Sequence, residues 1–157
     1  MQLIPSKFFI TSGKSSNPVS SLNAFDRALI EAGIGEQNLV AVSSVLPIGI
    51  VRIEPCEMPM GAVTHCVLSQ MRGKEDEVIS AGIAYAFRKD GKGGYVVEGH
   101  LHGSGADLRK ELEKKMKDMS LVRGVDFGPI EYLVEDMRVP HGCHGCCVSA
   151  VVFTEYL

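Results

Sequence analysis

Apolar and polar positions along the chain predict two amphipathic helices. The first follows Ser20 or Ser21, either of which can cap a helix, and ends near Gly33, because glycine readily adopts the left-handed conformation that terminates helices. The second starts after Ser104, with Asp107 three residues later in a capping arrangement, and runs to about Leu121. Their apolar stripes are Leu22, Phe25, Leu29 and Ala32 in the first helix, and Leu108, Leu112, Met116 and Met119 in the second.

Shorter apolar stretches, many of them rich in β-branched residues, predict about seven strands. The first, residues 7–11, is expected to be an edge strand that enters a loop of sequence SGKSSNP. A strand over residues 38–46 is expected to stop at Pro47, and strand character resumes over residues 48–53. Further strands are expected at residues 63–70, 78–87, 94–101, 127–139 and 146–156, the last apolar enough to be central.

These elements do not alternate regularly as strand, helix, strand, which favours an α+β chain over a parallel α/β sheet. The expected architecture is a layered sheet sandwich with the helices packed on its outer faces, an αββα-like arrangement. A chain of 157 residues, 45% of them hydrophobic, is long enough to bury one core. A single domain over residues 1–157 is therefore predicted.

Composition narrows the classes of function. The net charge of −3 is spread over interspersed charges and leaves no basic patch, so nucleic acid is not an expected partner. No apolar run approaches the roughly 20 residues that span a bilayer, and the N-terminus lacks a secretory pattern. Five cysteines, three of them crowded between positions 143 and 147, suit reduced thiols. A cytoplasmic protein without a membrane partner is expected.

The serine pair Ser43–Ser44 lies between two predicted strands, a position that on its own is typical of an ordinary turn. Its neighbours make it more specific: LNAFD opens a helix that ends in GIG, NL then precedes VSSVLP, and a later strand ends in VVEG. With these blocks in this order, nearly the whole chain resembles the pyruvoyl-dependent arginine decarboxylase family.

The resemblance implies a proenzyme that cuts itself into residues 1–43 (β chain) and 44–157 (α chain). It further implies a covalent pyruvoyl group made from Ser44, without pyridoxal phosphate, and conversion of arginine into agmatine and carbon dioxide for polyamine synthesis. Members of the family assemble as trimers with active sites between subunits, so a homotrimer is expected. The same machinery could act on lysine or ornithine, and this alternative stays open.

Self-cleavage has a physical requirement that the local sequence suits. The Ser44 hydroxyl must be held against the Ser43 carbonyl in a constrained turn, with the developing oxyanion stabilised. Val45 is stiff and Pro47 fixes its own φ, so the turn has little freedom to relax. Attack gives an ester, elimination gives dehydroalanine, and hydrolysis gives a pyruvoyl group and ammonia.

Three other residues are candidates for the site. Glu98 follows three apolar strand residues, and by resemblance it is the acid that returns a proton to the substrate Cα. Asp26 is placed by the resemblance in the substrate pocket, where a carboxylate can meet a guanidinium with two hydrogen bonds. Asn38 matches a family asparagine that acts in processing or substrate binding. Without the resemblance, these would be a strand-end acid, a helix-dipole acid and a partner of irregular backbone.

Two features lie outside the family pattern, except for Cys146, which resembles a family residue at the opening of the last strand. His100 and His102 would share a face with Glu98 if that strand continues, but such histidines are commonly solvated. The segment HGCHGCC contains His141, Cys143, His144, Cys146 and Cys147. Their spacing is too short for an ordinary structural zinc site, so no metal ligand is assigned. A non-enzymatic metal-binding or redox module remains the alternative function.

Overall fold

The computed structural model describes all 157 residues and contains two helices and two sheets, which confirms the predicted α+β class. The helices are α1 (Ser21–Glu31) and α2 (Gly105–Arg123). The five-stranded sheet has the order β2 (Asn38–Ala41), β5 (Val63–Gly73), β9 (His144–Tyr156), β1 (Pro5–Asn17) and β4 (Val51–Arg52). The four-stranded sheet has the order β3 (Val45–Leu46), β7 (Gly94–Leu101), β6 (Val78–Phe87) and β8 (Glu131–Arg138).

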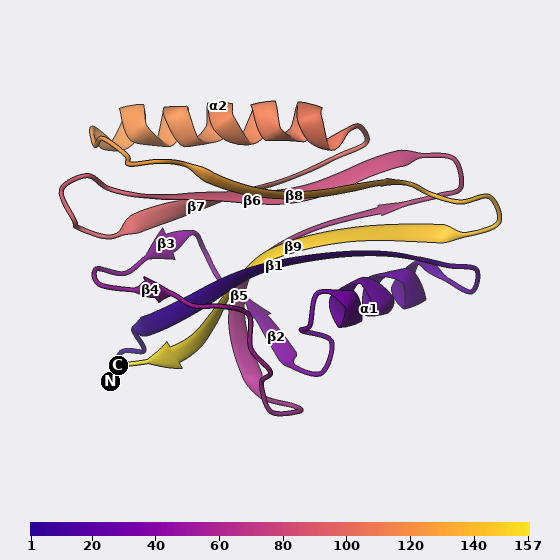
Figure 1. Ribbon diagram of the computed structural model, residues 1–157, viewed down its shortest axis with the longest axis horizontal. Coiled ribbons are helices and arrows are strands. Elements are labelled where there is room, and N and C mark those ends of the chain that lie inside the picture. Colours follow the sequence, from indigo (N-terminus) through magenta and orange to yellow (C-terminus); the bar gives the residue numbers. More distant parts are fainter.

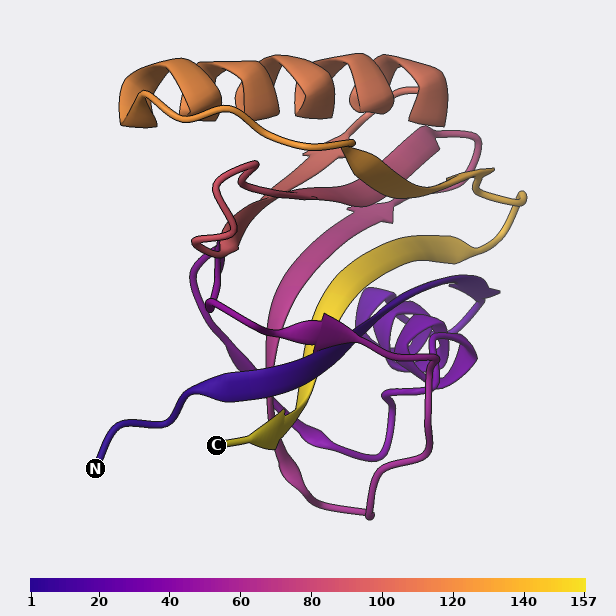
Figure 2. The same ribbon diagram turned by 60° about the vertical axis from the view of Figure 1, so that its left-hand side comes forward.

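The two sheets face each other, and each carries one helix on its outer face (Figure 1). Ala24 and Ala28 of α1 pack on the five-stranded sheet, and Leu108 and Leu112 of α2 pack on the four-stranded sheet. The turned view again has α1 and α2 on opposite sides of the sheets (Figure 2). Neither helix has the length and apolar character that crossing a bilayer requires.

An apolar core fills the space between the sheets. It combines Phe8, Val67 and Val151 from the five-stranded sheet with Ile83 and Val96 from the four-stranded sheet. Because alternate strand residues point to opposite faces, each central strand supplies this core with one set of side chains and its helix with the other.

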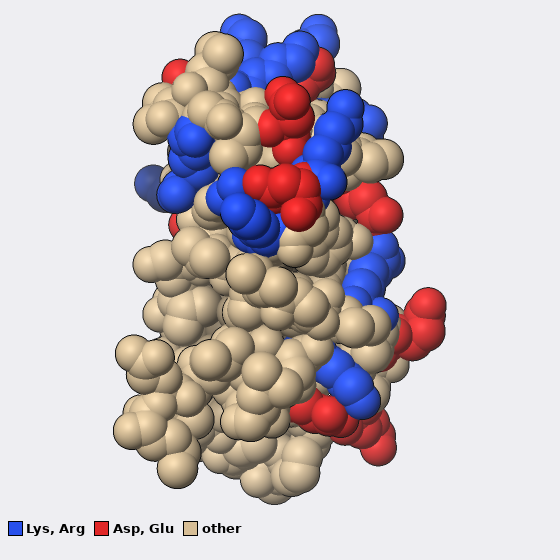
Figure 3. All heavy atoms as spheres, turned by 90° about the vertical axis from the view of Figure 1, so that its left-hand side faces the viewer, with Lys and Arg blue, Asp and Glu red and all other residues tan.

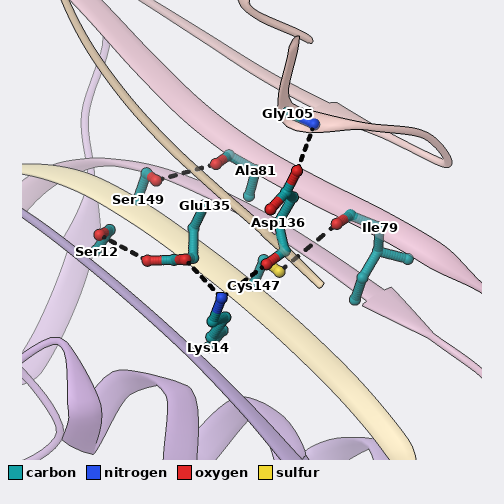
Figure 4. Close-up of polar contacts among 9 residues, drawn as sticks. All are labelled: Ser12, Lys14, Ile79, Ala81, Gly105, Glu135, Asp136, Cys147 and Ser149. Atoms are coloured by element: carbon teal, nitrogen blue, oxygen red, sulfur yellow. Dashed lines mark hydrogen bonds and ion pairs between the residues drawn. The ribbon is translucent and has the colours of Figure 1, made fainter. Parts of the chain in front are cut away.

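Polar contacts join the sheets toward the end where β8 turns into β9 (Figure 4). The buried Ser149 hydroxyl donates to the carbonyl of Ala81 (3.0 Å). The Lys14 ammonium lies 3.3 Å from Glu135 of β8, which also accepts a hydrogen bond from Ser12 (3.1 Å). The bond of Ser149 satisfies a hydroxyl that packing of the two sheets removes from water, whereas Lys14 keeps about half of its side chain exposed.

Helix α1 begins at the predicted cap and packs three of the four predicted stripe residues, Phe25, Leu29 and Ala32, against the core, but its most buried side is the alanine side. The Ser20 side chain accepts a hydrogen bond from the N–H of Asn23, and Gly33 has a positive φ of 77°. Leu22, expected in the apolar stripe, is exposed, whereas Ala24 and Ala28 are fully buried. The alanine side faces the sheet because α1 lies directly against the β1 backbone, where larger side chains would hold the helix and the strand apart.

Strand β1 corrects two expectations. The predicted loop SGKSSNP continues the strand through Asn17, because β9 pairs with it over the whole length, from Pro5↔Tyr156 to Asn17↔His144. It is also no edge strand at its start, since Lys7 pairs with Val51 of β4. The ladder to β9 overrides the local preference of glycine and serine for turns.

The predicted strand over residues 38–46 is two short strands in different sheets. β2 pairs with β5, and β3 pairs with β7. The strands predicted at residues 48–53 and 127–139 are shorter in the structure, where they are β4 and β8. The prediction for residues 94–101 matches β7, and the central place of the last strand is confirmed. α2 starts after Ser104 as predicted and buries Leu108, Leu112 and Met116.

Gly13 of β1 permits the close approach of α1, and replacing it should destabilise the fold. A Cβ at this position would lie 2.4 Å from the carbonyl oxygen of Ala28 and 2.8 Å from the nitrogen of Ala32. We expect Gly13→Ala to lower the free energy of unfolding by about 1–3 kcal/mol, as overpacking does, measured by urea denaturation. Gly128→Ala is the control, because its Cβ would meet only Phe87 at an ordinary 3.6 Å. Equal stability of the two variants would contradict the close approach.

Candidate active site

The peptide bond between Ser43 and Ser44 lies where the chain leaves one sheet and enters the other. Before it, the N–H of Val42 donates to the carbonyl of Cys66 on β5 (2.9 Å). After it, the carbonyl of Ser44 accepts from the N–H of Val96 on β7 (2.9 Å). Ser43 itself makes no backbone hydrogen bond. The bond is therefore anchored on both sides by different sheets while its own carbonyl is free to react.

A cavity of about 640 Å³ opens beside this bond, a size that suits a small molecule. Its walls come from residues 42–44, which form the crossing segment between the two sheets, from β5 and β7, and from the second half of α2. Half of the lining side chains are apolar. The lining residues are Val42, Ser43, Ser44, Val67, Val96, Val97, Glu98, Lys115, Asp118, Met119, Val122 and Arg123.

Glu98 reaches this cavity from β7. It stands two residues beyond Val96, whose side chain belongs to the core between the sheets, so strand alternation turns Glu98 toward that same face. Its side chain is exposed to the cavity rather than buried. The ammonium of Lys115 donates to the Glu98 backbone carbonyl (2.9 Å) and ties α2 to this strand. The structure thus brings Glu98 together with Ser43 and Ser44.

Three charged residues of α2 complete the cavity, and none of them was among the candidates predicted from the sequence. Lys115, Asp118 and Arg123 line it, and the Arg123 guanidinium lies 4.1 Å from the centre of the Tyr95 ring. With Glu98, they give the cavity two carboxylates and two cations, which suits a ligand that carries both charges. For Lys115 and Asp118 the only signal was their place on the polar side of a predicted helix, and periodicity cannot tell which part of that side meets a cavity. Arg123 lies beyond the predicted end of that helix near Leu121, because α2 is two residues longer than predicted.

Asp26 and Asn38 do not line this cavity within one chain. Asp26 is exposed on α1, which packs on the outer face of the five-stranded sheet. Asn38 opens β2, and its side-chain amide donates to the carbonyl of Gly61 (2.9 Å). The roles of both residues in processing or substrate binding stay predictions.

The two histidines of the VVEG strand are also outside the cavity. β7 ends at Leu101, so His102 lies beyond it, where its Nε2 is 3.2 Å from Glu77 at the far end of the sandwich. His100 is exposed.

The residues of HGCHGCC do not gather into one metal site, and only His141 belongs to a group of possible ligands, with the exposed Glu75 and Asp76. Most of it forms the start of β9, where neighbouring residues face opposite sides: Cys146 packs in the core under α1, and Cys147 packs with Ile79 between the sheets. His141 lies in the exposed turn before β9 with its Nδ1 2.6 Å from Glu75. The metal-binding or redox module is therefore not favoured.

The protein is thus of the α+β class. Its serine pair lies where the chain passes from one sheet to the other, and the adjoining cavity has room for a small ligand and contains the carboxylate of Glu98. The family model described as "Pyruvoyl-dependent arginine decarboxylase (PvlArgDC)" matches residues 7–157. This chain belongs to that family, as its sequence blocks predicted.

Similar proteins under the name pyruvoyl-dependent arginine decarboxylase come from several archaea. The protein of Methanothermobacter thermautotrophicus is 39% identical over 156 residues, which cover 98% of this chain and 99% of that protein. That of Methanocaldococcus jannaschii is 33% identical over 94% of this chain and 88% of the relative. That of Methanopyrus kandleri is 29% identical over 96% and 97%.

The buried cysteines should resist alkylation in the folded protein. Burial raises the pKa of Cys66 and of Cys146 to about 11 and that of Cys147 to about 12, so all three are thiols at pH 8, whereas the thiolate is the reactive form. We expect brief alkylation at pH 8, followed by mass spectrometry, to modify the exposed Cys56 and to spare these three.

The unfolded chain is the control, since it should be modified at all five cysteines. Because the folded pKa values lie above the unfolded value of about 8.5, stability should also fall as pH rises from there toward 11. Rapid alkylation of Cys147 in the folded state would contradict the burial.

Proposed function

We propose that this chain is a self-processing decarboxylase that converts arginine into agmatine and carbon dioxide. The observation that carries the proposal is the serine pair, anchored between two sheets at the wall of the cavity that also contains Glu98. The name that the similar archaeal proteins share supports arginine as the substrate. The two carboxylates and two cations of the cavity suit an amino acid, which carries both charges.

Cleavage begins when the Ser44 hydroxyl oxygen attacks the Ser43 carbonyl carbon. The C–N bond then breaks, the nitrogen takes up the hydroxyl proton, and an ester joins the two residues. Loss of the Ser44 α-proton and of the ester oxygen leaves a carboxylate on Ser43 and dehydroalanine at position 44. Water converts the latter into the pyruvoyl group with release of ammonia. The products are residues 1–43 and 44–157.

The surroundings of Ser44 fit a pyruvoyl group. Its side chain is half-buried on the cavity wall, and the Val96 N–H holds its carbonyl. A pyruvoyl ketone supplies an electrophile for the substrate α-amine and an acceptor for the electron pair left by departing carbon dioxide. Glu98 would hold the proton that returns to Cα, and Val67, Val96 and Val97 would exclude water around it.

The guanidinium of the substrate needs a carboxylate at the far end of the site. We assign this to Asp26 of a neighbouring subunit, with Asn38 in the same inter-subunit site, since neither lines the cavity of its own chain. A trimer would bring them together. The end of the molecule with β3, β4 and both termini supports such an assembly, because its lower half is a broad area with few charges (Figure 3). Exposed apolar residues on these segments are Leu3, Ile4, Val45, Ile48 and Val51. Extended apolar surfaces of this kind mark protein contacts.

Ser44→Ala should abolish processing, because no hydroxyl remains to attack the Ser43 carbonyl. Intact mass spectrometry of the wild type should give two fragments divided after Ser43, the larger without a free amino terminus. The variant should give one full-length chain that releases no carbon dioxide from arginine. Ser120→Ala, on α2 outside this cavity, is the control and should be cleaved normally. A wild type that is active as a single unbroken chain would contradict the proposal.

Glu98→Gln and Asp26→Asn should each be cleaved yet decarboxylate arginine at least about a hundredfold more slowly, the usual effect of losing an acid catalyst or a charged contact. Co-expression of the two variants tests the inter-subunit site. A mixed trimer contains sites that combine wild-type Glu98 of one subunit with wild-type Asp26 of the next. Random assembly should restore roughly a quarter of the wild-type activity. No recovery in verified mixed trimers would place both residues in one subunit's site.

A further inference from the structure

A second cavity, of about 350 Å³, adjoins the crossing segment beside the first. It is lined by Ser43 but not by Ser44, whereas the substrate cavity is lined by both. Apart from Ser43, its polar side chains are His65 and Tyr156, and it contains no carboxylate. Leu3, Pro5, Val42, Val45 and Phe153 form the remaining walls.

His65 and Tyr156 form one hydrogen-bonded unit. His65 lies on β5 two residues before Val67, so it points toward the inner face of its sheet, and Tyr156 ends β9 and packs against the same core. The His65 Nδ1 is hydrogen-bonded to the Tyr156 hydroxyl, and the rings meet edge to face with centroids 5.7 Å apart. Burial raises the pKa of Tyr156, which keeps its hydroxyl a donor.

The cleavage proposed above creates a new charge at this place. It turns the neutral Ser43 carbonyl into a carboxylate, which needs hydrogen-bond donors or a cation once it is held against apolar walls. In the substrate cavity, the carboxylates of Glu98 and Asp118 are already balanced by the cations of Lys115 and Arg123, so a third carboxylate would leave that cavity with an excess negative charge. The second cavity offers no acid and one residue that can become a cation.

We propose that the second cavity is the binding site of the Ser43 carboxylate, with His65 and Tyr156 as its donors. A protonated His65 gives its Nδ1–H to the Tyr156 oxygen and leaves the Nε2–H and the Tyr156 hydroxyl for the carboxylate. The two ends made by cleavage then separate into two cavities. The carboxylate is thereby held away from the dehydroalanine that it has just left, and the elimination cannot run backward.

A comparison of cleaved and uncleaved protein tests this site, which rests on the proposed self-cleavage. His65→Gln and Tyr156→Phe are each made in the wild type, which carries the carboxylate, and in Ser44→Ala, which does not. Thermal unfolding is measured at one protomer concentration. We expect each substitution to lower the melting temperature by about 5 °C more in the cleaved protein than in the uncleaved one, the effect of losing a charge-assisted hydrogen bond. His102→Gln, at the opposite end of the sandwich, should shift both proteins equally.

The outcomes separate the two proposals. A wild type that stays whole contradicts self-cleavage itself. A wild type that is cleaved but shows the same shifts as Ser44→Ala contradicts only the carboxylate site. A His65→Gln chain that fails to cleave assigns the pair to the cleavage step instead, and this also overturns the carboxylate site. Tyr156→Phe keeps the test decisive if His65→Gln does not fold.

Discussion

The rest of the site depends on one constraint: the chain is hydrogen-bonded to a different sheet on each side of a single peptide bond. Val42 is bonded to β5 and Ser44 to β7, and the residue between them is held by neither. Such a bond cannot relax without breaking a contact to one of the sheets. The relative position of the two sheets therefore sets the geometry of Ser43 and Ser44, and the inner core and the polar contacts between the sheets maintain that position.

The same crossing explains why two cavities meet at Ser43. Where the chain passes between the sheets, side chains cannot pack continuously on either side of it, and space remains beside β5 and β7. On one side α2 encloses that space with charged residues. On the other side the end of β9 encloses it with Tyr156 and apolar residues. The fold thus provides two chemically different surroundings for the two sides of the Ser43–Ser44 bond.

The HGCHGCC segment illustrates how a strand disperses a cluster of residues that looks like a site in the sequence. Adjacent residues of β9 face opposite sides, so Cys146 and Cys147 stabilise two separate cores. Conversely, Ser44, Glu98 and Asp118 are far apart in the sequence and line one cavity, because β3 pairs with β7 and α2 crosses above it. Residues that are neighbours along a strand therefore need not share a site, whereas the pairing of strands decides which distant residues do.

The sequence by itself determined the elements whose signals are local: the caps at Ser20 and Ser104, the buried stripe of α2, and the motif blocks that contain Ser44 and Glu98. Only the tertiary structure decided the length of β1, the division of residues 38–46 between two sheets, the alanine face of α1 and the place of α2's charges at the cavity. The physical reason is the distance along the chain over which each interaction acts. Capping and helical periodicity act within a turn or two of the chain, whereas strand pairing and the close approach at Gly13 join segments whose partners no local pattern can identify.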